Sequence, residues 1–244
     1  MAIGRTGVLH RAIRQCCALF PPHRPNEARC ANLWHHVPSR GIAADVARSA
    51  RQRPELALIL ILPAAPEELA FGLSSEADSR FGEWLQARCV DKVARAFGRR
   101  ALIVAPAVPR RAAPEDGPER AVLHGAPIVY VHAKVSVFDG ATAIVSSANL
   151  NGRSLRWDTE AGVRLDDPVD AAHLERRLMA HWMGEDGPRR EGESGIDLVA
   201  RWRRRIGADL HTRPEDRRGF LLPYPLRAAR EAGQYLPGIP DEMV

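Results

Sequence analysis

The hydrophobic positions of the chain follow two periods, which predict helices and strands in turn. Ile42, Val46 and Ala50 recur at helical spacing. They predict a helix over residues 39–51, with Ser39 as its N-cap. The first regular element of the chain is therefore expected to be an amphipathic helix with one buried face.

Two continuous apolar runs predict strands that are covered on both faces. These runs are residues 56–62 and 101–108, and their unbroken apolar character is typical of strands buried between two layers. Between them, an apolar stripe that reaches from Phe81 to Phe97 predicts a long helix. Gly98 is placed to end that helix.

The most regular alternation lies at residues 128–138, and it predicts one strand. Its odd positions are apolar and share one face. His132 and Lys134 therefore stand two residues apart on the opposite face. Asp139 and Gly140 follow, and this pair is typical of a tight turn that leads into a returning strand.

The last part of the chain is again helical. After a further strand at 159–165, Asp167 and Pro168 provide an N-cap and a proline at the first helical position. A second, shorter helix is expected at 196–206. Proline and arginine dominate from there on, which favours an extended tail.

These elements divide the chain into three parts. Residues 1–38 lack a clear period and contain several prolines, so a poorly ordered arm is expected. Residues 39–210 alternate between helices and strands, which predicts an α/β domain with one mixed sheet flanked by helices. Residues 211–244 form the extended tail, rich in proline and arginine.

Composition limits the class of protein without choosing a substrate. The chain has 244 residues, of which 45% are hydrophobic and 27% charged, as is ordinary for a globular protein. Its net charge of +5 favours an anionic partner, either a phospholipid head group or nucleic acid. Four cysteines without a CxxC pair indicate reduced thiols, and no apolar run is long enough to span a bilayer. We therefore expect a cytoplasmic protein, with peripheral contact to a membrane left open.

The polar side chains around the central hairpin suit attack at phosphorus. A neutral imidazole can act as a nucleophile or as a proton donor near neutral pH. An ammonium group two residues away, with a nearby amide or hydroxyl, can stabilise phosphate oxygens. A carboxylate is needed to fix the imidazole tautomer. Because the cations belong to the chain itself, neither a metal nor a cofactor is expected.

The spacing of these residues also resembles a known family. His132, Lys134 and Asp139 fit the pattern HxKxxxxD, and Ser147 and Asn149 follow as Ser-x-Asn. The combination is similar to the phospholipase D superfamily, and the wording SANLNGRS…DTE looks most like the second motif of two-motif bacterial phospholipases D. The resemblance implies the α/β sandwich of that superfamily for the domain.

The resemblance also implies a role for each site residue. His132 would form a covalent phosphohistidine or protonate the leaving alcohol, and Glu160 is the candidate carboxylate that orients its imidazole. Asp139 belongs to the motif but leaves the strand away from the histidine, so it would hold the hairpin. The residues that would bind phosphate oxygens are Lys134, Ser147 and Asn149.

A single HxKxxxxD motif leaves the site half complete, because two-motif members build one active site from two histidines. Either a homodimer supplies the second histidine, or the chain is a truncated or frame-shifted C-terminal half. The expected activity is hydrolysis of a phospholipid or phosphatidyl transfer. A nuclease-type homodimer acting on nucleic acid and a catalytically incomplete half-enzyme are the alternatives.

Overall fold

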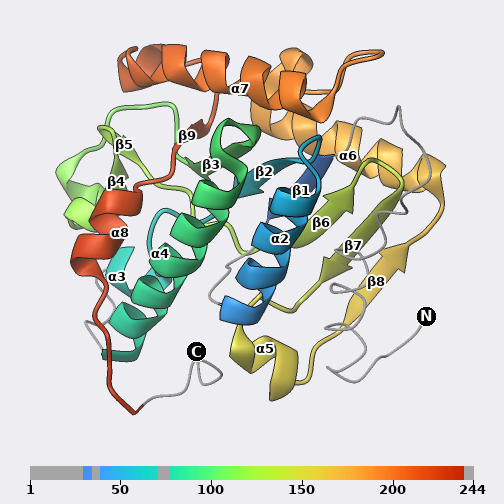
Figure 1. The fold of residues 1–244 in the computed structure, drawn as a ribbon. Helices are drawn as coiled ribbons and strands as arrows, with labels where there is room; N and C mark the ends of the chain where they lie inside the picture. The colour runs from blue at the N-terminus through green and yellow to red at the C-terminus, as the bar shows by residue number, and fades with distance from the viewer. Residues whose placement is uncertain (1–29, 35–38, 71–76, 239–244) are drawn as a thin grey trace.

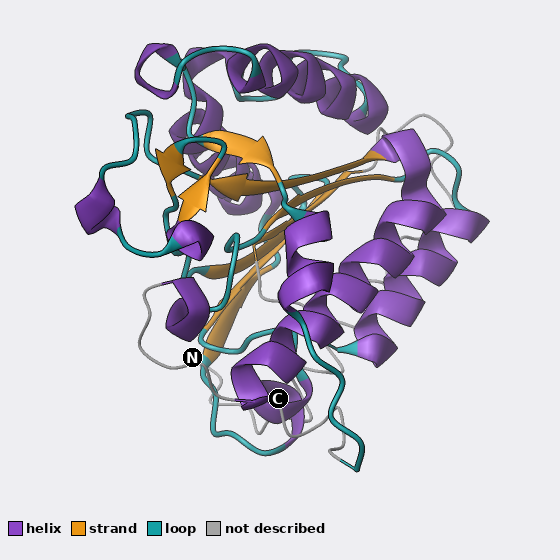
Figure 2. Cartoon of the chain, turned by 90° about the vertical axis from the view of Figure 1, so that its left-hand side faces the viewer, coloured by secondary structure: helices purple, strands orange, loops and turns teal. Residues whose placement is uncertain are grey.

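A computed structural model describes residues 30–34, 39–70 and 77–238 of the chain. These residues form three layers, with a twisted sheet between two layers of helices (Figure 1). Figure 2 shows the sheet nearly edge-on, with helices on both sides of it. The site described below lies at one edge of this arrangement.

The strands are β1 (Cys30–Trp34), β2 (Ala57–Ile61), β3 (Ala101–Pro106), β4 (Val122–Leu123), β5 (Ala126–Pro127), β6 (Lys134–Phe138), β7 (Thr142–Ser146), β8 (Gly162–Leu165) and β9 (Leu221–Pro223). The α-helices are α2 (Arg40–Gln52), α3 (Glu67–Ala70), α4 (Ala77–Phe97), α5 (Gly152–Arg156), α6 (Pro168–Met183), α7 (Gly195–Leu210) and α8 (Leu226–Ala232). The 3-10 turns are Gly98–Arg100, Pro114–Asp116, Glu119–Ala121, Gly184–Asp186 and Pro214–Asp216.

The main sheet is mixed, with strand order β8-β7-β6-β1-β2-β3-β9. Its centre is parallel, because β1 pairs with β2 and β2 with β3 in the same direction. The outer strands β6, β7, β8 and β9 are antiparallel to their neighbours. β4 and β5 form a separate small hairpin. The predicted α/β fold with one mixed sheet flanked by helices is thus confirmed.

Strand β2 shows why its sequence is apolar throughout. Leu58 and Leu60 pack into the core shared with α2 and α4. Ile59 and Ile61 face the other way and pack against α6 and α7. Both faces of a central strand are covered, so no position along it can be polar.

Two helix starts follow the predicted capping chemistry. The Ser39 hydroxyl accepts a hydrogen bond from the Ile42 amide at 3.4 Å and caps α2. The Asp167 carboxylate accepts from the Val169 amide at 2.7 Å, and Pro168 occupies the first turn of α6. Each cap satisfies an amide that has no partner within its helix.

The strand predicted at 128–138 is half as long as expected. β6 begins only at Lys134, which lies opposite Ser146, the last residue of β7. Before that point the chain forms a hydrogen bond with β3, in which the Val129 amide donates to the Pro106 carbonyl at 2.9 Å. Residues 129–133 therefore cross the end of the sheet between β3 and β6. β7 ends at Ser146 and offers no pairing partner to the residues before Lys134, so an alternating sequence alone does not make a strand there.

The predicted domain boundaries need correction at both ends. Residues 30–34 fall in the predicted arm but form β1, which pairs with both β2 and β6. The rest of that arm, 1–29 and 35–38, lies outside the described residues. The tail is extended at β9, which pairs with β3, but it also contains helix α8 packed on α4. The α/β domain therefore includes sequence on either side of residues 39–210.

No helix within the described ranges is long and apolar enough to cross a bilayer.

Candidate active site

Of the sequence-predicted site residues, His132 and Asn149 line a cleft at the carboxyl ends of the parallel strands. This is the edge at which open α/β sheets generally bind ligands. The cleft has a volume of about 230 Å³. Its lining comes from the turns after β2, from α3 and α4, from the crossing segment and from the region around α5. The lining residues are Pro63, Pro66, Glu67, Glu68, Asp78, Ser79, Gly82, Tyr130, Val131, His132, Asn149, Asn151 and Arg153.

His132 lies on the crossing segment, two residues before β6 begins. Its side chain is exposed to the cleft, and its ring stacks near that of Tyr130, with centroids 6.3 Å apart. This placement differs from the predicted strand but keeps the imidazole accessible. An accessible imidazole can reach the phosphorus of a bound ligand.

Lys134 is the first residue of β6 and is only 6% exposed. Its ammonium is partly desolvated, which lowers its pKa, and the nearby carboxylate of Glu160 acts in the opposite direction. The net pKa shift is downward. A poorly solvated cation interacts strongly with an anion that replaces its lost water.

Ser147 and Glu160 form a pair beside Lys134. The Ser147 hydroxyl donates to the Glu160 carboxylate and accepts from the Ala161 amide at 3.0 Å. The backbone adds a further bond from the Ser147 amide to the Ala161 carbonyl at 2.9 Å. These bonds hold the residue just after β7 against the residues just before β8. They fix Glu160 close to Lys134.

Glu160 does not contact the histidine that it was predicted to orient. Both side chains are described, and no hydrogen bond or ion pair joins them. The charge of Glu160 acts on Lys134 instead, and its carboxylate binds Ser147. Within one chain, the expected carboxylate-imidazole pair is therefore not formed.

Asp139 lies at the far end of β6 from Lys134. Five residues of strand separate them, which is about 17 Å. Asp139 and Gly140 have φ values of 55° and 63°, and the Ala141 amide donates to the Phe138 carbonyl at 2.9 Å. Residues 139–141 connect Phe138 to Thr142, which lie opposite each other in the hairpin, and the positive φ values of Asp139 and Gly140 reverse the chain there. Asp139 thus shapes the hairpin, and the structure keeps it away from the cleft.

Asn149 lines the cleft together with His132, as the motif predicts. Asn151, two residues on, caps helix α5 by accepting from the Ser154 amide at 2.8 Å. Arg153 in that helix also lines the cleft, and its guanidinium pairs with Asp158 at 3.2 Å. The short helix therefore directs two further polar side chains to the site.

The sequence analysis missed an acidic rim, which we define as Glu67, Glu68 and Asp78. These residues come from α3 and α4, yet they line the same cleft as His132. Glu67 and Glu68 lie near Tyr130, whose pKa is raised first by burial and then by these two charges. No spacing along the sequence could have connected them with a motif more than fifty residues away. Only the folded sheet brings the two regions together.

One comparison with known proteins covers the segment that contains the motif. Residues 112–182 match a family model described as the phospholipase D-like domain of cardiolipin synthase. No curated protein matches the chain. Among solved structures, a polyphosphate kinase from Porphyromonas gingivalis matches with 12% identity and a TM-score of 0.41. The match covers 84% of this chain and only 29% of the kinase chain.

The cleft is lined by a histidine and an asparagine of the motif, and the buried Lys134 lies two residues from that histidine in sequence. The matched segment contains all of the motif residues from His132 to Glu160, so the match supports the resemblance of this part of the chain to the phospholipase D superfamily. Members of that superfamily are phosphodiesterases or phosphotransferases. The substrate of this chain is a separate question.

Proposed function

We propose that the protein is a phospholipase D-type phosphodiesterase that acts on phospholipid through a phosphohistidine. The observation that carries the proposal is the exposed imidazole of His132 close in sequence to the buried ammonium of Lys134, at a cleft also lined by Asn149. One group can attack phosphorus while the others hold its oxygens.

The proposed reaction has two steps and needs two histidines. A ring nitrogen of His132 attacks phosphorus, and a P–N bond forms as the P–O bond to the head-group alcohol breaks. The partner's His132 donates a proton to the leaving alkoxide. Water then attacks phosphorus, gives its proton to the partner's His132, and displaces the first imidazole. The products are the free alcohol and phosphatidic acid; a second alcohol in place of water gives phosphatidyl transfer.

A homodimer is part of this proposal, because one chain supplies one motif. A two-fold interface would present the same cleft from each subunit to the other. Lys134 and Asn149 of each chain would bind the phosphate oxygens. In this scheme Glu160 keeps Lys134 charged and Ser147 in place.

The acidic rim supports a phospholipid over nucleic acid. A nucleic acid strand carries a phosphate on each side of the scissile one, and these would meet Glu67, Glu68 and Asp78. A phospholipid brings a single phosphodiester. If its head group is an ammonium, such as choline or ethanolamine, the carboxylates and the nearby Tyr130 ring would attract it.

Substrate preference tests the proposal. We expect the purified protein to cleave phosphatidylcholine faster than single-stranded DNA. Glu67→Gln with Glu68→Gln should lower kcat/KM for phosphatidylcholine about five- to tenfold relative to phosphatidylglycerol, since each partly solvated charge contributes up to about 1 kcal/mol. The matched control is Glu185→Gln with Glu191→Gln, two exposed residues of the α6–α7 connection. Faster cleavage of DNA than of either lipid would contradict the proposal.

The fall of activity at alkaline pH is expected to follow the deprotonation of the Lys134 ammonium. Its protonated form binds phosphate, and burial lowers its pKa. Activity should therefore fall as pH rises, and do so below the usual pKa of lysine. Glu160→Gln removes the charge that raises this pKa, so in this variant the fall should move to still lower pH. Measured kcat profiles with the same alkaline limb in both proteins would show that Lys134 does not control it.

A further inference from the structure

Helix α4 carries a basic face on its outward side, remote from the sheet. Trp84, Arg88, Asp91, Lys92 and Arg95 recur at helical spacing along it, over about 16 Å. Figure 1 shows α4 between α2 and α8, and each neighbour adds an arginine. A groove of about 650 Å³ follows this surface. We define the α4 basic face by the groove residues Arg40, Trp84, Arg88, Asp91, Lys92, Arg95 and Arg230.

Among the described residues, the charges of this face are only partly balanced. Four cationic side chains, Arg88, Lys92, Arg95 and Arg230, surround one carboxylate, Asp91, which pairs with Arg95 at 2.9 Å and also with Arg230. Helix α7 is also rich in arginine but differs. Its Arg201 binds Glu193 at 2.7 Å, and its Arg203 donates to the Arg99 carbonyl at 2.8 Å. The α7 arginines thus serve the fold, whereas the α4 basic face keeps an excess of positive charge.

Trp84 lies at the centre of the face and is partly exposed. Its ring stacks on Phe81 at 5.6 Å and lies 4.8 Å from the Tyr235 ring. The guanidinium groups of Arg40 and Arg88 lie 5.3 Å and 4.9 Å from its centroid. Such cation–π contacts hold both arginines at the surface. Four groups already pack around this ring, so only part of it is accessible and it makes a poor platform for stacking a nucleic acid base.

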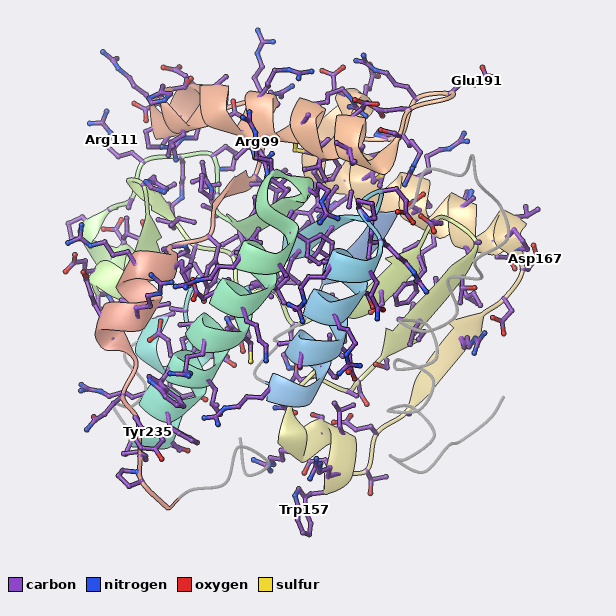
Figure 3. All side chains as sticks on the ribbon, viewed as in Figure 1. Arg99, Arg111, Trp157, Asp167, Glu191 and Tyr235 are labelled. Atoms are coloured by element: carbon purple, nitrogen blue, oxygen red, sulfur yellow. The ribbon has the colours of Figure 1, made fainter. Side chains whose placement is uncertain are left out.

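The α4 basic face adjoins the active-site cleft along one helix. Asp78, Ser79 and Gly82 of α4 line the cleft, and Trp84 begins the groove. Figure 3 shows Tyr235 and Trp157 toward the same end of the molecule, and they are 53% and 71% exposed. Exposed aromatic rings beside basic side chains are typical of surfaces that lie in the head-group region of a bilayer.

We propose that the α4 basic face docks the protein on an anionic phospholipid surface and so holds the cleft over its substrate. This inference rests on the proposed function for its purpose, but the docking is measured separately from turnover. The charge of the face complements anionic head groups. The acidic rim beside it would repel a polyanion that continued from the groove into the cleft, which favours a lipid surface over nucleic acid.

Charge reversal tests the docking. The variant Lys92→Glu with Arg95→Glu leaves Trp84 and its two arginines in place. The control is Arg176→Glu with Arg177→Glu on α6, two exposed residues on the opposite side of the sheet, with the same change in net charge. Cosedimentation would use vesicles of equal parts phosphatidylcholine and phosphatidylglycerol, and vesicles of phosphatidylcholine alone.

We expect the unchanged protein to bind the anionic vesicles and the α4 variant to bind them at least tenfold more weakly. The control variant should bind within about twofold of the unchanged protein, and high salt should weaken binding. Equal binding by the two variants would overturn the proposal. So would an α4 variant that loses binding to a single-stranded oligonucleotide while it keeps binding to the vesicles.

Lysine labelling provides an independent readout, because Lys92 and Lys134 are the only lysines of the chain. Lys92 is exposed and Lys134 is buried. Anionic vesicles should slow the reaction of Lys92 with an amine reagent, and an unchanged rate would contradict docking. A short-chain, water-soluble phospholipid should be cleaved equally by the unchanged protein and the α4 variant. If it is not cleaved by either, the proposed function fails while the docking result still stands.

Discussion

His132→Ala is expected to lower phosphodiester turnover by a thousandfold or more without unfolding the protein. The imidazole is the proposed nucleophile, and removing a nucleophile or a positioned general acid typically costs at least a hundredfold. The side chain is exposed, and its ring contact within the chain is with Tyr130. The fold should therefore keep its thermal transition. Steady-state assays with phosphatidylcholine, beside a thermal melt, measure both effects.

His173→Ala is the matched control, since His173 is an exposed histidine on α6. It should retain full activity. Variant and unchanged subunits can also be mixed and allowed to exchange. If each site needs two histidines, activity should follow the square of the unchanged fraction, because only dimers of two unchanged subunits work. A linear dependence would mean that each chain acts alone, and retained activity in His132→Ala would exclude a catalytic role for the residue.

The parts of the fold that the sequence predicts well are those fixed by neighbours along the chain or by complete burial. Ser39 caps α2 because its hydroxyl reaches an amide three residues away. Asp139 and Gly140 adopt the positive φ values of a tight turn, which their residue types favour locally. The unbroken apolar sequence of β2 indicates directly that both faces of this strand are buried. None of these depends on knowing which distant segments meet.

The predictions that were wrong concern elements whose structure depends on residues distant in sequence. The alternation before Lys134 continues past the point where β7 ends, so its period could not reveal where pairing stops. Cys30–Trp34 becomes a central strand because β2 and β6 lie on either side of it, although prolines and polar residues surround it in sequence.

The candidate site divides in the same way. His132, Lys134 and Asn149 lie at one end of the sheet, and the motif links them because they are close together in sequence. The sequence did not predict the acidic rim, because its residues in α3 and α4 precede the motif by more than fifty residues. Within one chain Glu160 binds Ser147 and acts on Lys134, contacts that the motif spacing does not indicate.

Arg120→Leu is expected to lower the free energy of unfolding by about 3 to 5 kcal/mol, the usual cost of breaking a buried ion pair. Glu83 in α4 is 1% exposed, and its carboxylate pairs with the Arg120 guanidinium. Next to them, Gln86 donates to the Tyr224 hydroxyl at 3.1 Å. Burial lowers the pKa of Arg120 and raises that of Tyr224. Without Arg120, the carboxylate of Glu83 would stay buried with no opposite charge.

The double variant Glu83→Met with Arg120→Leu shows how much of the lost stability comes from leaving one buried charge without its partner. Replacing both charges by apolar groups removes the uncompensated carboxylate, so most of the lost stability should return. Urea titrations of the two single variants and the double variant give the coupling free energy. A double variant as unstable as Arg120→Leu would mean that shape, rather than charge, holds the segment around Arg120 on α4. Recovered stability in the double variant would mean that the charges of this buried pair specify how α4 packs against the segment that precedes the motif. Helix α4 also lines the cleft.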